Sequence, residues 1–128
     1  MANMTTVEIK AFIPARDYEL SKRFYTDLGF TPAFSSNDLS YLHAGKSSFL
    51  LQNFYQKELC ENLMMHLLVE DVEAWWQHVL TQRLAERYSV RVNPPEDRPW
   101  GIRDFTIDDP SGVLWRIGQN IDSANELK

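Results

Sequence analysis

The chain has 128 residues, a length that fits one domain and leaves no room for a second. Its net charge of −5, with acidic and basic residues interspersed and no basic stripe, argues against a nucleic-acid partner. The single cysteine excludes an internal disulfide, and neither a signal peptide nor a run of about 20 apolar residues is found, so we expect a cytoplasmic protein that does not enter a membrane.

The first half of the chain predicts a strand, a helix and three more strands. Apolar residues alternate along residues 7–13, which is the period of a strand, and Pro14 ends that strand because proline cannot donate to a sheet ladder. Asp17 can cap a helix whose apolar residues recur every four positions until Gly29. Further strand-like runs lie at residues 31–35, 39–43 and 47–54.

The same order of elements restarts after a linker at about residues 56–63. A strand at residues 64–69 precedes a helix that Asp71 can cap, and Pro94, Pro95 and Pro99 indicate a loop further along. The last three strands are expected at residues 90–93, 102–108 and 113–119. These patterns predict one domain over residues 1–128, with modules at about 6–55 and 64–120 and a frayed polar tail at 121–128.

Two segments resemble the signatures of a known superfamily. Residues 17–30 are similar to the first-helix signature of the glyoxalase, bleomycin-resistance and extradiol-dioxygenase superfamily, and residues 99–115 are similar to its C-terminal signature. The loop Pro99-Trp100-Gly101 is most like the bleomycin-resistance branch. The resemblance implies an α+β fold in which two βαβββ modules form a curved mixed sheet around a cavity, in a protein that is often a homodimer.

The resemblance also implies where a metal would bind, because metal-dependent members of the superfamily hold one divalent ion with four side chains. In this chain the four positions fall on Lys10, Gln52, Met64 and Arg116. Protonated lysine and guanidinium offer no lone pair, and glutamine and thioether are poor donors for a hard divalent ion. We therefore predict no metal and no other cofactor, and the alternative is a displaced metal site formed by Glu8, Gln52 and His66.

Strand alternation, applied to the implied cavity, predicts the residues that bind the ligand. They are Glu8, Lys10, Phe12, Gln52, Phe54, Met64, His66 and Arg116, with Trp100 leaning in from the proline-rich loop. A mostly apolar pocket with a few converging polar groups is typical of a small-molecule site. Arg116 interrupts an apolar strand, so it either pairs internally, with Glu8 as the obvious partner, or binds a carboxylate or phosphate of the ligand.

The sequence favours a bleomycin-resistance-like protein that binds a small organic ligand, an antibiotic or an aromatic or anionic metabolite, rather than an enzyme. Lys10 and Arg116 favour an anionic or neutral aromatic ligand over a cationic drug. The first alternative is a glyoxalase-like lyase or isomerase, or a dioxygenase-type enzyme, using a displaced metal or an acid–base pair of His66 and Glu8. The second is a structural or regulatory dimer whose cavity is filled by Trp100 and Phe54.

Overall fold

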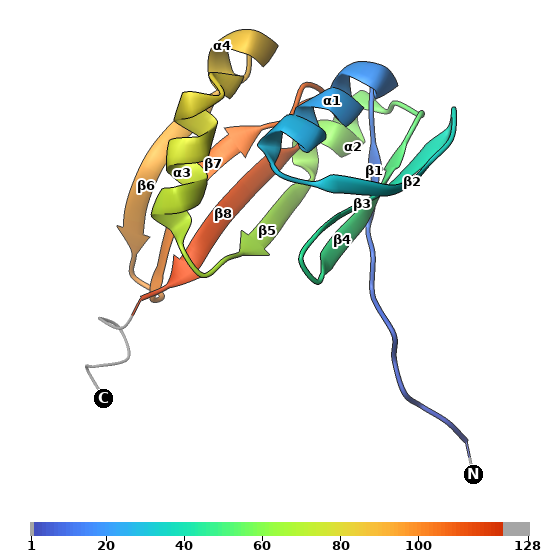
Figure 1. The fold of residues 1–128 in the computed structure, drawn as a ribbon, viewed down its shortest axis with the longest axis horizontal. Helices are drawn as coiled ribbons and strands as arrows, with labels where there is room; N and C mark the ends of the chain where they lie inside the picture. The colour runs from blue at the N-terminus through green and yellow to red at the C-terminus, as the bar shows by residue number, and fades with distance from the viewer. Residues whose placement is uncertain (1, 122–128) are drawn as a thin grey trace.

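The computed structural model describes residues 2–121, which form two four-stranded sheets with helices packed against them (Figure 1). The first module contains β1 (Phe12–Pro14), α1 (Tyr18–Leu28), β2 (Thr31–Ser35), β3 (Leu39–Ala44) and β4 (Ser47–Gln52). A short helix, α2 (Lys57–Asn62), leads to the second module. That module contains β5 (Met64–Leu68), α3 (Val72–Thr81), α4 (Leu84–Tyr88), β6 (Val92–Arg98), β7 (Ile102–Asp108) and β8 (Leu114–Asn120).

Both sheets are mixed and share one topology. The strand order is β1-β4-β3-β2 in the first sheet and β5-β8-β7-β6 in the second. The first strand of each module runs parallel to the last strand of the same module, and the other pairs are antiparallel. The predicted α+β fold, with a strand, a helix and three strands repeated twice, is therefore confirmed, as two adjacent sheets with no closed barrel.

The predicted helix boundaries follow from local capping. The Asp17 carboxylate accepts a hydrogen bond from the Leu20 amide at 3.1 Å, and Asp71 caps α3 in the same way through the Ala74 amide. Gly29 ends α1 with a φ of +136°, a backbone conformation that other residues rarely adopt. The negative charges of these two N-cap residues also interact favourably with the positive N-terminal end of each helix dipole.

The strand predicted at residues 7–13 is present only as β1, which begins at Phe12. Residues 2–11 instead continue from β1 without strand structure as an extended arm, whose N-terminal part points away from the two sheets (Figure 1). The apolar side chains of Val7 and Ile9 are 97% and 95% exposed, so no strand among residues 2–121 covers them. The last backbone bond of the arm to the sheet joins the Leu50 amide to the Ala11 carbonyl at 2.9 Å.

The second module differs from the prediction at its prolines. Pro94 and Pro95 lie inside β6 rather than in a loop, at a break in register between Asn93 and Glu96. A proline is tolerated there because β6 is an edge strand and the bulge removes the need for ladder donors. The predicted linker contains helix α2, and residues 122–128 of the predicted tail lie outside the described residues.

The core faces of the two sheets meet in one aromatic cluster. The rings of Phe49 on β4 and Trp115 on β8 are 5.3 Å apart, and Tyr25 of α1 contacts both. The Tyr25 hydroxyl donates to Asp109 at 2.6 Å and accepts from the Trp115 indole nitrogen at 2.8 Å. Burial raises the pKa of Tyr25 well above its usual value, and burial also raises the pKa of Asp109 against the opposing effect of the Tyr25 hydrogen bond. This buried network ties α1 of the first module to the β7–β8 turn of the second.

Candidate ligand-binding surface

Each sheet keeps one face free of the core, and the predicted ligand-binding residues that belong to strands lie on these faces. We call these surfaces the first and second open faces. On the first sheet, Phe12 lies beside Leu50, and Leu50 lies beside Tyr41, all on the side opposite the buried Leu51. The alternation used to assign Glu8, Lys10 and Phe12 to one side is consistent with this arrangement.

Glu8 gathers three donors at the edge of the first open face. Its carboxylate accepts from Lys10 Nζ at 2.8 Å, from the Tyr41 hydroxyl at 3.2 Å, and from the Ser48 hydroxyl. The hydrogen bond from Lys10 is the main reason why the pKa of Glu8 is below its usual value, and Glu8 in turn raises the pKa of Lys10. The charge of Lys10 is thus matched within the first open face.

The second open face contains a polar row across three strands. His66 on β5 lies beside Arg116 on β8, which lies beside Thr106 on β7. Arg116 is ion-paired internally, which is one of the two roles expected from the sequence, but Glu8 is not its partner. Its guanidinium lies 3.3 Å from the carboxylate of Asp104, which also accepts from Arg98 Nε at 2.9 Å.

Asp104 and Arg98 were not identified from the sequence. The alternation of polar and apolar residues along β7 could have indicated Asp104. From Asp104 to Asp108 the even positions of β7 are polar or charged, while Phe105 and Ile107 between them are fully buried. That alternation places Asp104 on the same side as Arg116 once the register of β7 and β8 is known. Register is a tertiary property, so the pairing could not be found from the strand pattern alone.

The nine predicted residues lie on two surfaces. Glu8, Lys10, Phe12, Gln52 and Phe54 belong to the first module, and Met64, His66, Trp100 and Arg116 belong to the second. Among the residues described, no hydrogen bond or ion pair joins a member of one set to a member of the other. Both sheets direct their other face into the shared core, so the open faces do not enclose a common cavity within one chain.

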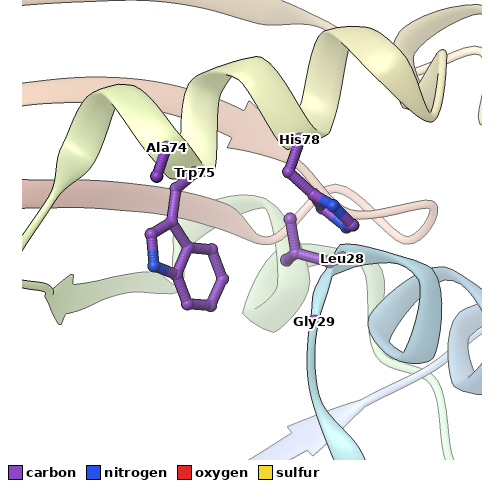
Figure 2. A pocket seen from close by; sticks show the side chains of 5 residues that line it. All are labelled: Leu28, Gly29, Ala74, Trp75 and His78. Atoms are coloured by element: carbon purple, nitrogen blue, oxygen red, sulfur yellow. The ribbon is translucent and has the colours of Figure 1, made fainter.

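Two pockets of similar size lie near the module boundary. One, of about 260 Å³, lies between β4 and β5 and includes His66, the only one of the nine predicted residues among those that line it. The other, of about 240 Å³, lies between the end of α1 and α3 (Figure 2). Figure 2 shows Trp75 and His78 directed from α3 toward the end of α1, where Leu28 and Gly29 lie. A Cβ on Gly29 would lie 3.3 Å from the Trp75 indole, and His78 Nε2 is 2.6 Å from the Asp27 carbonyl oxygen. This second pocket is on the helical side and contains no predicted ligand-binding residue.

The residues at the superfamily's metal positions do not fit a divalent metal. Lys10 and Arg116 are both ion-paired cations, and neither Gln52 nor Met64 is a good ligand for a hard ion. Within one chain the displaced site is not formed either, because over residues 2–121 no three His, Cys, Asp or Glu side chains lie close enough to hold an ion.

These features define a protein of two strand-helix-three-strand modules, each sheet of which leaves one face uncovered. The chain belongs to the Glyoxalase/Bleomycin resistance protein/Dioxygenase superfamily, whose sequence model matches residues 7–117. The resemblance found in the two motifs is therefore confirmed. No helix within residues 2–121 is both long and apolar enough to span a bilayer.

Individual relatives lie in the bleomycin branch of the superfamily. A bleomycin resistance protein from Klebsiella pneumoniae is 26% identical over 113 residues, covering 84% of this chain and 88% of the relative. A crystal structure of a bleomycin-binding protein complexed with bleomycin superposes with a TM-score of 0.76 at 24% identity, over 90% of this chain and 99% of that one. The bleomycin-binding protein of Streptomyces verticillus, complexed with copper(II)-bleomycin, gives a TM-score of 0.72 at 20% identity, over 92% and 98% of the two chains. At these identities the two structures establish a shared fold.

Proposed function

We propose that this protein binds and sequesters a small aromatic molecule, of the kind represented by antibiotics, as a cytoplasmic homodimer without a metal centre. The observation that carries the proposal is the set of large apolar side chains left exposed on or beside the open faces. They are Phe12, Phe34, Phe54, Met64, Leu68 and Trp100. Large apolar side chains that gather at a protein surface mark a site of interaction.

Trp100 is the most prominent of these side chains. It lies in the tight turn between β6 and β7, closed by a hydrogen bond from the Gly101 amide to the Arg98 carbonyl at 3.1 Å. Its side chain is 65% exposed, so it does not fill the core of its own chain. An exposed indole at the end of a sheet offers a large stacking surface to an aromatic ligand. The bleomycin-binding relatives support an antibiotic as the ligand class.

A second copy of the chain would complete the binding site. One chain leaves its two open faces on separate surfaces, whereas the usual small-molecule site is concave and surrounds most of its ligand. In a homodimer, the first open face of one protomer and the second open face of its partner would enclose the ligand between them. The arm, with Val7 and Ile9 almost fully exposed, offers an apolar strand pattern that the same partner would cover.

Isothermal titration calorimetry with bleomycin and a panel of aromatic compounds tests the ligand. We expect Trp100→Ala to weaken binding by about tenfold or more, as expected for an aromatic anchor. Leu80→Ala is the matched control, because Leu80 is an exposed apolar residue on α3 and lies on neither open face. The proposal fails if no compound binds at millimolar concentration. It also fails if Trp100→Ala and Leu80→Ala both bind the ligand with the affinity of the wild type.

Light scattering on the full chain, and on a chain lacking residues 2–9, tests the assembly. We expect a dimer for the full chain at micromolar concentration and a weaker dimer without the arm, because the deletion removes exposed apolar residues that the partner would cover. A full-length monomer that still binds its ligand at one site per chain would refute the shared site while leaving ligand binding intact.

A further inference from the structure

The second open face contains two arginines that share one buried carboxylate. Asp104 is 1% exposed and accepts from Arg98 Nε at 2.9 Å and from Arg116 Nη1 at 3.3 Å. The side chains of Arg98 and Arg116 are 21% and 29% exposed, so both remain partly accessible to solvent. One further carboxylate, Glu96, touches Arg98 at 3.3 Å, but its side chain is 64% exposed, so solvent screens that contact.

The backbone makes room for this arrangement at Gly118. Gly118 lies beside Asp104 across the β7–β8 ladder, and a Cβ placed there would lie 2.8 Å from Asp104 Cβ and 2.9 Å from a methyl group of Ile102. Real Cβ atoms do not approach other carbon atoms so closely. Glycine at this position therefore leaves room for the Asp104 side chain next to β8.

Arg116 has N–H donors that Asp104 does not use. Arg116 contacts the shared carboxylate through Nη1 alone, and within residues 2–121 its Nε and Nη2 form no hydrogen bond. A guanidinium has five N–H donors in a planar fork that matches the two oxygens of a carboxylate, sulfonate or phosphate. His66 lies directly beside Arg116 on β5 and is exposed, which adds a second donor to the same area.

From this geometry we infer that the second open face has a subsite for an anionic group of the aromatic ligand. Arg116 makes the direct contact, His66 borders it, and Asp104 and Arg98 are positioning residues that hold the guanidinium with its free edge outward. The ligand class is thus an aromatic compound carrying a carboxylate, sulfonate or phosphate. The inference rests on the proposed function, because it specifies the chemistry of the same ligand.

Lys10 does not offer an equivalent site on the first open face. Its ammonium is 2.8 Å from the Glu8 carboxylate, and it also lies 5.2 Å from the centre of the Tyr41 ring. On the first open face one ammonium group faces one carboxylate, whereas on the second open face two guanidinium groups share one buried carboxylate. The difference assigns the anionic end of the ligand to the second open face and leaves the aromatic portion for the side chains around it.

A pair of fluorescent dyes tests the subsite. Anilinonaphthalene sulfonate and the neutral N-phenylnaphthylamine share one aromatic scaffold and differ by the sulfonate. The affinity for the sulfonate dye divided by that for the neutral dye therefore measures the contribution of the anionic group to binding. We expect Arg116→Gln to reduce this ratio by about tenfold or more, since a charged hydrogen-bonding partner is lost. The matched control is Arg103→Gln, because Arg103 forms a similar pair with Asp97 but lies at a position of β7 that alternates to the other face.

Asp104→Asn separates positioning from simple charge. Removing a negative charge next to Arg116 would strengthen sulfonate binding if only net charge mattered. A positioning role predicts the opposite, a lower preference for the sulfonate dye, with unchanged binding of the neutral dye as the check that the fold is intact. Tighter sulfonate binding in this variant would overturn the role assigned to Asp104.

The remaining outcomes separate the inference from the proposed function. If both dyes bind the wild type and Arg116→Gln leaves their affinity ratio unchanged, the anionic subsite is refuted while aromatic binding stands. If neither dye nor bleomycin binds the wild type, the proposed function fails and the subsite fails with it. A reduced ratio in Arg103→Gln equal to that in Arg116→Gln would also refute the inference, since the effect would then not depend on the open face.

Discussion

Replacing Tyr25 by phenylalanine is expected to destabilise the fold strongly, although it removes only one oxygen atom. Tyr25 is fully buried, and its hydroxyl is the link between Asp109, at 2.6 Å, and the indole nitrogen of Trp115, at 2.8 Å. Asp109 Oδ1 would keep its two backbone donors, from Ser111 and Val113, but Oδ2 would lose the donor it has in the structure. The Trp115 N–H would be left without an acceptor in the core.

The expected cost can be worked from these contacts. A hydrogen bond to a charged group contributes about 1.5–3 kcal/mol, and a buried donor left without a partner costs about 1–3 kcal/mol. Together they give a loss of about 2.5–6 kcal/mol in the free energy of unfolding, at the upper end of what single substitutions cause. With a urea m-value of about 1.5–2 kcal/mol/M, the midpoint of unfolding should fall by about 2 M.

Urea denaturation followed by tryptophan fluorescence measures this change, at one fixed protein concentration so that any dimer affects both proteins equally. Tyr41→Phe is the control, because the Tyr41 hydroxyl contacts Glu8 at an exposed position, and its loss should change stability by less than about 0.5 kcal/mol. Equal midpoints for Tyr25→Phe and the wild type would refute the claim that the buried network holds the two modules together.

Three further outcomes are expected. The free energy of unfolding should fall as pH rises above about 10, because the pKa of Tyr25 is raised in the folded protein and the unfolded chain releases this proton first. The loss is up to about 1.4 kcal/mol per pH unit. Urea midpoints between about pH 9 and 11 should therefore fall more steeply for the wild type than for Tyr25→Phe, and equal slopes would contradict this. Gly118→Ala should cost about 1–3 kcal/mol, because its Cβ would lie 2.8 Å from Asp104 Cβ, and an unchanged melting temperature would show that the strand adjusts freely. Elemental analysis of protein purified without chelators should find no stoichiometric divalent metal, and one ion per chain would contradict the argument from Lys10 and Arg116.

Much of the fold could be predicted because its signals are local. A capping carboxylate such as Asp17 and a four-residue apolar period fix a helix within a few residues of sequence, and the structure begins α1 immediately after that cap. The strand at residues 102–108 was found with the same bounds for a similar reason. Helices α2 and α4 were missed because each is one to two turns long and shows no apolar period over so few residues.

The candidate site was only partly predictable, because its assembly depends on tertiary contacts. Alternation within a strand placed Met64, His66 and Arg116 on one side of the second sheet, and the register of β5 and β8 agrees. It could not supply Asp104 as the partner of Arg116, since the residue that lies nearby on another strand depends on register. It also assumed that Glu8 would be within reach, which depends on how the modules pack.

The packing of the modules determines what one chain can bind. Tyr25, Phe49 and Trp115 draw the same face of both sheets into one core, so each open face is left pointing away from that core. A chain built in this way has two half-surfaces and a strand-like arm whose apolar residues have no neighbour of their own. The strand-like alternation at residues 7–11 has a use in a dimer, because a strand of a second copy can pair with it. This is why we expect ligand binding and dimerisation to weaken together when the arm is removed.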